Sequence, residues 1–215
     1  MRMAFLIAAT LSAVPMAARA QMSAPVLSPD SAKRLHENYP RKAVHKGKSA
    51  AALVDLWSDA RGQIYKCDLV GSAGDERLAG SVCELMKRVR LSPAEDDTGQ
   101  PVTGRLRTLI KLSVPGTEEA KMVEEMVERP DLELTVNKLP GDAKTLEFDL
   151  AIAVEPMGQV RACEAASDAP SAYADVACDR VRAIEMPVGT GPDGTPQAYV
   201  TDAKARFVAP DGADQ

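Results

Sequence analysis

Apolar and polar positions alternate along residues 50–115 in a way that predicts two strands, a helix and a third strand. The first two strands alternate with a period of two and are separated by a turn signal that ends at Gly62, so we expect a hairpin. Apolar residues then recur at helical spacing from Leu78 to Val89, and Asp75 stands where an N-cap is expected. The predicted elements are strands at 52–59 and 63–70, a helix at 75–88 and a strand at 102–114.

The final strand of this set has two unlike faces. One face is largely apolar and consists of Leu106, Thr108, Ile110, Leu112 and Val114. The opposite face consists of Arg105, Arg107, Leu109, Lys111 and Ser113. Because successive side chains on a strand point to opposite sides, we expect the second face to be exposed to solvent.

The second half of the chain follows the same order of elements less regularly. Its predicted elements are strands at 146–154 and 160–165, a helix at 171–184 and a strand at 197–208. Between the two halves, residues 117–128 are predicted to form an acidic linker helix with a weak apolar stripe.

Short sequence matches at a nearly constant offset indicate that the second half repeats the first. The offset is 96 before the second cysteine of each half and 95 from that cysteine onward. The matched segments are 62–67 with 158–163, Cys83 with Cys178, and 99–101 with 194–196. Cysteines, glycines and prolines matched in one order favour duplication of a small unit over chance similarity.

The cysteines are Cys67, Cys83, Cys163 and Cys178. Four cysteines allow three pairings, and a unit that folds by itself should form its bond internally. The repeat therefore predicts Cys67–Cys83 and Cys163–Cys178. Closing a loop of about 15 residues contributes about 3 kcal/mol, which matters for a domain with a small core.

A series of short motifs runs through the first half in a fixed order. The motifs are Tyr39-Pro40, the turn 59–64, residues 70–74 with Leu78, residues 89–94, and the turn 99–102. In this order they resemble the TonB C-terminal-domain family over about 76 residues. The second half keeps only the 158–160 turn, the cysteine pair, Met186-Pro187 and the 194–196 turn, and resembles a degenerate copy.

The resemblance implies an α+β chain of two tandem TonB-C-like domains. Each would have a small antiparallel three-stranded sheet, packed helices and one internal disulfide. It also implies that the domain binds an envelope protein or peptide, of which an outer-membrane transporter is one example, by pairing a strand at a sheet edge. The expected edge is the final strand of the first repeat, with Arg105, Arg107, Leu109, Lys111 and Ser113. Its basic residues would favour an acidic partner.

The first twenty residues have the features of a secretory signal cleaved after Ala20, which predicts a periplasmic protein with no membrane span after cleavage. Retention of this segment as an anchor is the alternative. The expected organisation is a signal at 1–20, a flexible lead-in at 21–30, a first repeat at 31–115, a linker helix at 116–130, a second repeat at 131–209 and a tail at 210–215.

Charge and motifs argue against several classes of function. Loss of Arg2 and Arg19 with the signal takes the net charge from −5 to −7, which disfavours sequence-independent nucleic-acid binding. The Asp97-Thr98-Gly99 triplet follows two acidic residues and is expected to be a solvated turn rather than a protease site.

Other candidate sites are also incomplete. The 189–194 glycines lack the strand and helix of a dinucleotide site, and His36 and His45 lack further metal ligands. We expect no enzyme activity, no cofactor and no metal. Two alternatives stay open, namely a structural protein whose repeats pack together and hide their edges, and an exported hydrolase. The partner and the oligomeric state stay open as well.

Overall fold

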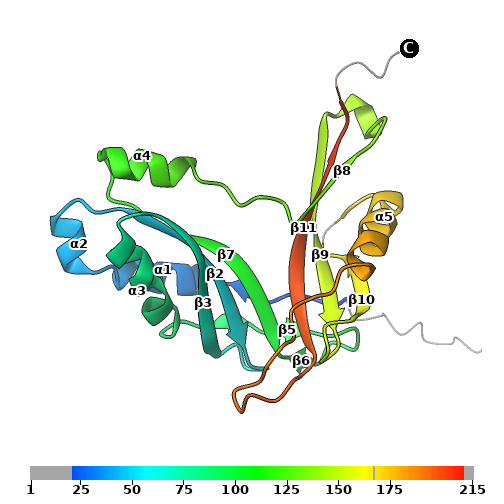
Figure 1. Ribbon diagram of the computed structural model, residues 1–215, viewed down its shortest axis with the longest axis horizontal. Coiled ribbons are helices and arrows are strands. Elements are labelled where there is room, and N and C mark those ends of the chain that lie inside the picture. The colour runs from blue at the N-terminus through cyan, green and yellow to red at the C-terminus, as the bar shows by residue number, and fades with distance from the viewer. Residues whose placement is uncertain (1–20, 167, 211–215) are drawn as a thin grey trace, which may run out of the picture.

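The computed structural model describes residues 21–166 and 168–210, so the expected signal at 1–20 and most of the expected tail lie outside the described residues. The described chain is α+β and is built round one seven-stranded sheet (Figure 1). Six strands follow the order β10-β9-β11-β7-β2-β3, and β8 pairs with β11 beside this path.

The first half of the chain forms a hairpin, a helix and a third strand, as its periodicity predicts. Asp75 caps the helix, since its side chain accepts a hydrogen bond from the Leu78 amide at 3.0 Å. The elements are α1 (Pro29–Glu37), α2 (Arg41–His45), β2 (Ala50–Ser58), β3 (Ile64–Gly74), α3 (Glu76–Met86) and β7 (Gly104–Leu112). The core beneath α3 includes Val54, Leu56, Val82, Met86 and Leu106.

The second half has the corresponding order of elements and one strand that the sequence pattern did not predict. The additional strand is β8 (Leu132–Thr135), which pairs in parallel with the end of β11. The other elements are β9 (Thr145–Val154), β10 (Val160–Ala165), α5 (Ser171–Arg182) and β11 (Tyr199–Val208). The core beneath α5 includes Leu150, Ile152, Val181, Tyr199 and Phe207.

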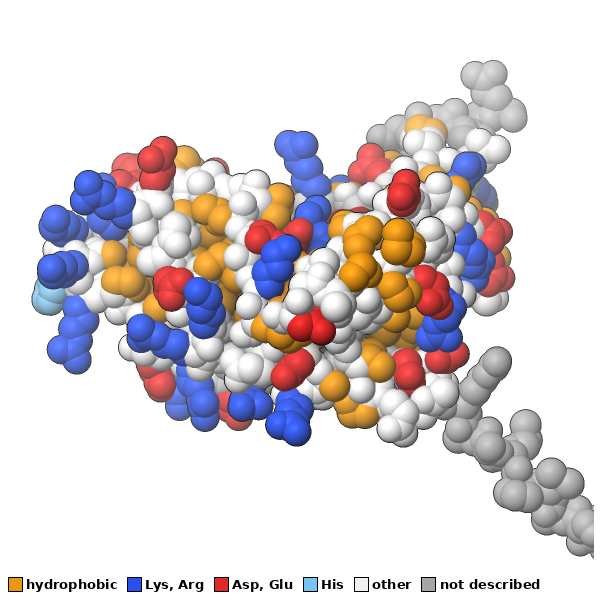
Figure 2. Space-filling view, turned by 60° about the horizontal axis from the view of Figure 1, so that its bottom comes forward, with side chains coloured by type: hydrophobic (Ala, Val, Ile, Leu, Met, Phe, Trp, Pro, Cys, Tyr) orange, Lys and Arg blue, Asp and Glu red, His pale blue; other side chains and the backbone are white. Residues whose placement is uncertain are grey.

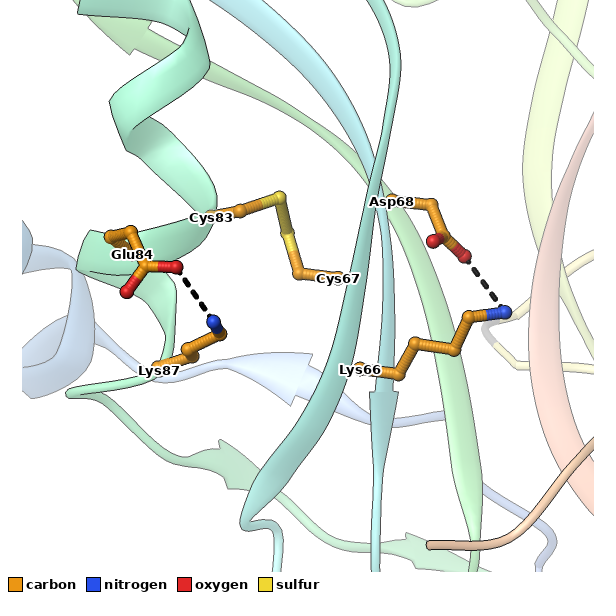
Figure 3. The surroundings of a disulfide bond; sticks show 6 residues. All are labelled: Lys66, Cys67, Asp68, Cys83, Glu84 and Lys87. Carbon is orange, nitrogen blue, oxygen red and sulfur yellow. Dashed lines mark hydrogen bonds and ion pairs between the residues drawn. A yellow bond between two sulfur atoms is a disulfide. The ribbon is translucent and has the colours of Figure 1, made fainter. Parts of the chain in front are cut away.

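Each half contains one disulfide that joins its hairpin to its helix. Cys67 on β3 bonds to Cys83 on α3 (Figure 3). Cys163 on β10 bonds to Cys178 on α5, and the Cα atoms are 5.5 Å apart in both bonds. These are the two pairings that the sequence predicts.

The two halves share a sheet instead of forming the two separate three-stranded sheets that we expected. β7 and β11 pair in parallel, with Gly104 and Arg105 opposite Val200 and Thr201. Trp57 packs edge-on against Tyr199 at 4.9 Å between ring centroids and joins the core beneath α5.

The neighbour of Trp57 on β2, Leu56, belongs to the core beneath α3. Adjacent residues of a strand point to opposite sides of a sheet. The two helices therefore pack on opposite faces of the shared sheet.

The segment before α1 is ordered and packed, in contrast to the flexible lead-in that we expected. Met22 is only 2% exposed and packs with Ala151, Ala153 and Val200 of the second half. The next residues form β1 (Val26–Leu27), which pairs with β4 (Leu91–Ser92). Burial of Met22 between the halves anchors this segment, and the contact is with residues too distant in the sequence for a local pattern to reveal.

Short elements complete the chain. They are β5 (Ala94–Glu95), β6 (Pro101–Val102), α4 (Glu118–Glu125) and the 3-10 turn η1 (Pro140–Asp142). The linker helix thus ends at Glu125, earlier than the predicted helix at 117–128, and the chain is not helical from there to β8.

A substitution at Gly62 tests the tight turn between β2 and β3. Gly62 has a φ of +73°, and a Cβ at this position would lie 1.9 Å from the Leu91 carbonyl oxygen. We expect Gly62→Ala to lower the free energy of unfolding by about 3 kcal/mol because the backbone would have to move. Gly80→Ala is the control, because Gly80 is an exposed position on α3 and a Cβ there would meet nothing within 4 Å. It should raise stability by about 0.5–1 kcal/mol in denaturant unfolding. Equal effects at the two sites would contradict this account.

Candidate functional site

The outer edge of β7 is only partly paired. All nine residues of β7 face β2, whereas β11 pairs with β7 at only two positions, Gly104 and Arg105. The Leu109 amide donates to the Glu128 carboxylate, so it points away from β2. Since backbone groups alternate in direction along a strand, Arg107 and Lys111 also present their N–H and C=O groups outward.

A cleft of about 1160 Å³ lies where β7 and β11 separate. Figure 1 shows the two strands close together near β5 and β6 and apart toward α4 and β8. Most of the lining comes from residues 105–109 of β7, the connection 126–131, the N-terminal segment 21–27, and Asp202 with Lys204 of β11. Leu53, Asp149 and Ala166 complete it. The cleft therefore lies between the two halves and directly beside the expected recognition edge.

Two arginines of that edge are bound within the sheet. Arg105 donates to Asp55 at 2.8 Å and Arg107 donates to Asp55 at 2.7 Å. Burial alone would raise the pKa of the Asp55 carboxyl, but the hydrogen bonds from Arg107 and Arg105 outweigh it, and the pKa is lowered.

Arg105 was expected to face solvent, but its side chain is buried. Its exposed fraction is only 6%, and its guanidinium lies 5.8 Å from the centroid of the Trp57 ring. Asp55 binds both guanidinium groups and offsets one of their two charges, so these arginines support an acidic partner less than their number suggests. The correction arises from an ion pair between residues 50 positions apart, which local periodicity does not reveal.

The connection between α4 and β8 occupies part of the gap between the strands. Glu128 accepts the Leu109 amide of β7. At the other side, the Asp131 amide donates to the Lys204 carbonyl at 2.9 Å, and the Lys204 amide donates to the Asp131 carboxylate at 2.8 Å. Residues 126–131, which we call the bridge segment, thus satisfy polar groups on the edges of both strands.

Asp202 is a site residue that sequence reasoning missed. Burial raises the pKa of its carboxyl to about 7, and the nearby carboxylates of Asp131, Asp149 and Glu128 add to the shift. Its Oδ1 atom is buried and has no hydrogen-bond partner among the described residues. On the sequence, Asp202 looks like an ordinary polar position of a strand, so only the sheet arrangement identifies it.

The structure separates the predicted edge residues. Arg105, Arg107 and Leu109 line the cleft, and the Lys111 ammonium donates to the Glu124 carbonyl at 2.8 Å. Ser113 lies beyond the end of β7.

The rejected motifs fall in turns or on separate helices. The Asp97 triplet lies in the turn where Asp96 accepts from Thr98, and the 189–194 glycines lie outside the helices and strands. His36 is on α1 and His45 on α2. The described residues contain no group of three or more His, Cys, Asp or Glu placed to hold a metal ion.

Residues 36–111 match the family model of the Gram-negative bacterial TonB protein C-terminal. The resemblance to this family is confirmed for that segment. The segment begins in α1 and includes β2, β3, α3 and nearly all of β7, and therefore the strand that lines the cleft.

One curated relative is Protein TonB of Vibrio cholerae serotype O1 (strain ATCC 39315 / El Tor Inaba N16961). It is 32% identical over 83 residues, which are 39% of this chain. The match covers 34% of the relative, so the chain spans about a third of its length. No solved structure matches the chain.

No helix among residues 21–166 and 168–210 is long and apolar enough to cross a membrane.

Asp202 gives a prediction for stability against pH. Its folded pKa of about 7 lies above the ordinary value of 3.8, so its ionisation favours the unfolded chain. The penalty is absent below about pH 4, grows between pH 4 and 7, and is constant above. The pKa is raised by about three units, at about 1.4 kcal/mol each. We therefore expect Asp202→Asn to raise the free energy of unfolding by up to about 4 kcal/mol at pH 8 and by little at pH 4.

The measurement is urea unfolding at several pH values. Asp175→Asn removes the same charge from an exposed position on α5 and is the control. It should change stability by less than about 0.5 kcal/mol across the range. If Asp202→Asn raised the free energy of unfolding by the same amount at every pH, the raised pKa of Asp202 would be contradicted.

Proposed function

We propose that this chain is a periplasmic protein-interaction module whose cleft receives an extended segment of an envelope partner. That segment would add to the outer edge of β7 at Arg107–Lys111 by backbone hydrogen bonding. The observation that carries the proposal is the incompletely paired β7, which lies within the segment that matches the TonB C-terminal family and beside an open cleft. An outer-membrane transporter is one class of partner.

The edge offers what strand addition requires. Arg107, Leu109 and Lys111 direct backbone donors and acceptors outward, and such pairing needs little side-chain identity. Leu53, Leu109 and Met126 add apolar surface to the cleft walls. A partner segment of about five residues would span this length of strand, since a strand rises about 3.4 Å per residue.

Binding would require the bridge segment to move. Glu128 holds the Leu109 amide, which an incoming strand also needs. The partner's carbonyl would replace the Glu128 carboxylate at that amide. The bridge segment would thus compete with the partner for β7.

We also propose that the second half is a diverged second copy of the TonB-C-like unit, so that the chain is a tandem pair. Equivalent hydrogen bonds support this reading. The Leu91 amide donates to the Gly62 carbonyl at 2.9 Å, and the Met186 amide donates to the Gly158 carbonyl at 3.0 Å. These bonds keep the sequence offsets of 96 and 95. The two disulfides also join matching strands and helices.

A structural role without peptide binding is the second candidate. Pairing of β7 with β11 and the contact between Trp57 and Tyr199 favour it, because they already join the two halves. We do not propose hydrolysis. Asp202 has a suitable pKa for acid chemistry, but the adjacent carboxylates of Asp131 and Asp149 are both bonded to Lys204.

The test uses synthetic peptides with the sequences of the short transporter segments that would pair with β7, which we call box peptides. We expect a binding peptide to shift the NMR signals of Arg107, Leu109 and Lys111. Glu128→Ala should tighten binding about fivefold, since a net hydrogen bond is worth about 1 kcal/mol.

Glu125→Ala removes the same charge from an exposed position at the end of α4 and is the matched control. It should leave the affinity unchanged. If peptides shift only signals outside β7, or if both variants bind alike, strand addition at this edge is excluded.

A further inference from the structure

A second cavity lies on the first half, where the start of α1 meets the chain that follows α3. Its volume is about 300 Å³. Its charged lining residues are Asp30, Arg34, Lys87, Arg88 and Arg90, and three serines and Gln63 complete the polar lining. None of these residues lines the cleft beside β7.

Most of the positive charge at this cavity is uncompensated. Arg34, Arg88 and Arg90 form no ion pair with any described residue, whereas Lys87 bonds to Glu84 at 2.6 Å (Figure 3). With Asp30 and Glu84 counted against the four cations, the cavity keeps a net charge of about +2. Such a site favours an anion, because guanidinium groups form strong paired hydrogen bonds with oxyanions.

The backbone that carries Arg90 is firmly held. The Ser31 hydroxyl donates to the Arg90 carbonyl at 2.6 Å, and Arg90 also forms an antiparallel bridge with Gln63. The residues on either side of Arg90, Val89 and Leu91, are 2% and 3% exposed. The Arg90 side chain is free to reach solvent while its attachment point is fixed, which lowers the ordering cost of binding.

We propose that this cavity is a binding site for a phosphate-type oxyanion. A phosphomonoester carries nearly two negative charges at neutral pH and three acceptor oxygens. It therefore matches both the excess charge and the number of unpaired guanidinium groups. A single carboxylate supplies only one charge and two oxygens. Lysine is a poorer substitute for arginine here because it lacks the planar fork.

The distribution of charge along the chain would guide an anion to this half. Residues 21–115 contain 15 basic and 11 acidic residues, whereas residues 116–215 contain 9 basic and 20 acidic residues. Figure 2 shows Lys and Arg side chains crowded at the left end of the molecule, where α2 lies in Figure 1. Such an asymmetric field raises the local concentration of anions at the positive side.

The phosphate could belong to a free ester or to a lipid headgroup, and the proposal concerns the chemistry that both share. It does not rest on strand binding at β7. We therefore expect a variant that loses the anion site to bind box peptides as the parent protein does.

The experiment titrates the purified full-length protein with inorganic phosphate and with glycerol phosphate at constant ionic strength, followed by NMR. We expect saturable shifts in residues 28–34 and 87–92. The triple variant Arg34→Gln, Arg88→Gln, Arg90→Gln should bind at least about tenfold more weakly, because charge-assisted hydrogen bonds are lost. The control, Arg41→Gln, Arg77→Gln, Arg180→Gln, makes the same charge change at exposed positions outside both the cavity and the cleft, and it should bind within about twofold of the parent.

Vesicles of phosphatidylglycerol, with phosphatidylcholine vesicles as reference, identify the source of the phosphate. Binding of soluble phosphate alone assigns a free ester. If the protein also binds phosphatidylglycerol vesicles, and only the triple variant loses this binding, a lipid headgroup is a second source of the phosphate. Non-saturable shifts, equal losses in both triple variants, or binding to vesicles without binding of soluble phosphate would each overturn the proposal. If the triple variant does not fold, protection of the parent arginines by phosphate against a dicarbonyl reagent decides, and no protection overturns it.

Discussion

The outer edge of β7 is the constraint on which the rest of the structure depends. A strand edge must satisfy its backbone groups, and here β11 does so at only two positions before the two strands separate. The separation leaves a cleft, and the bridge segment reaches into it through Glu128 and Asp131. β11 closes this edge at one end, and further along only the Glu128 carboxylate holds a backbone group of the strand. The edge is therefore covered in the isolated protein, yet a partner strand can gain access by displacing one side chain.

The contacts that join the halves explain why this arrangement is stable. Trp57 crosses into the core beneath α5, and Met22 fills the opposite side of the sheet between the halves. Each disulfide fixes a helix to its hairpin, so the helices and hairpins move as units. Opening of the bridge segment would then disturb neither hydrophobic core.

The sequence predicted the features that depend on local order. Periodicity located both hairpins and helices, the 96 and 95 offsets paired the cysteines, and the motifs located the family segment. It did not predict features that depend on distant contacts. Met22 looked like part of a flexible lead-in. Arg105 looked exposed, because local alternation does not reveal its partner Asp55 on another strand, and Glu128 looked like the end of a helix. Burial decided the first of these, an ion pair across the sheet the second, and a hydrogen bond to a distant backbone amide the third.

Amide hydrogen exchange along β7 in the isolated protein tests the central claim most directly. The account predicts strong protection at Arg105, where β11 pairs with the strand, intermediate protection at Leu109, and fast exchange at Arg107 and Lys111. Uniform strong protection from residue 105 to residue 111 would contradict it, because the edge would then be closed along its whole length.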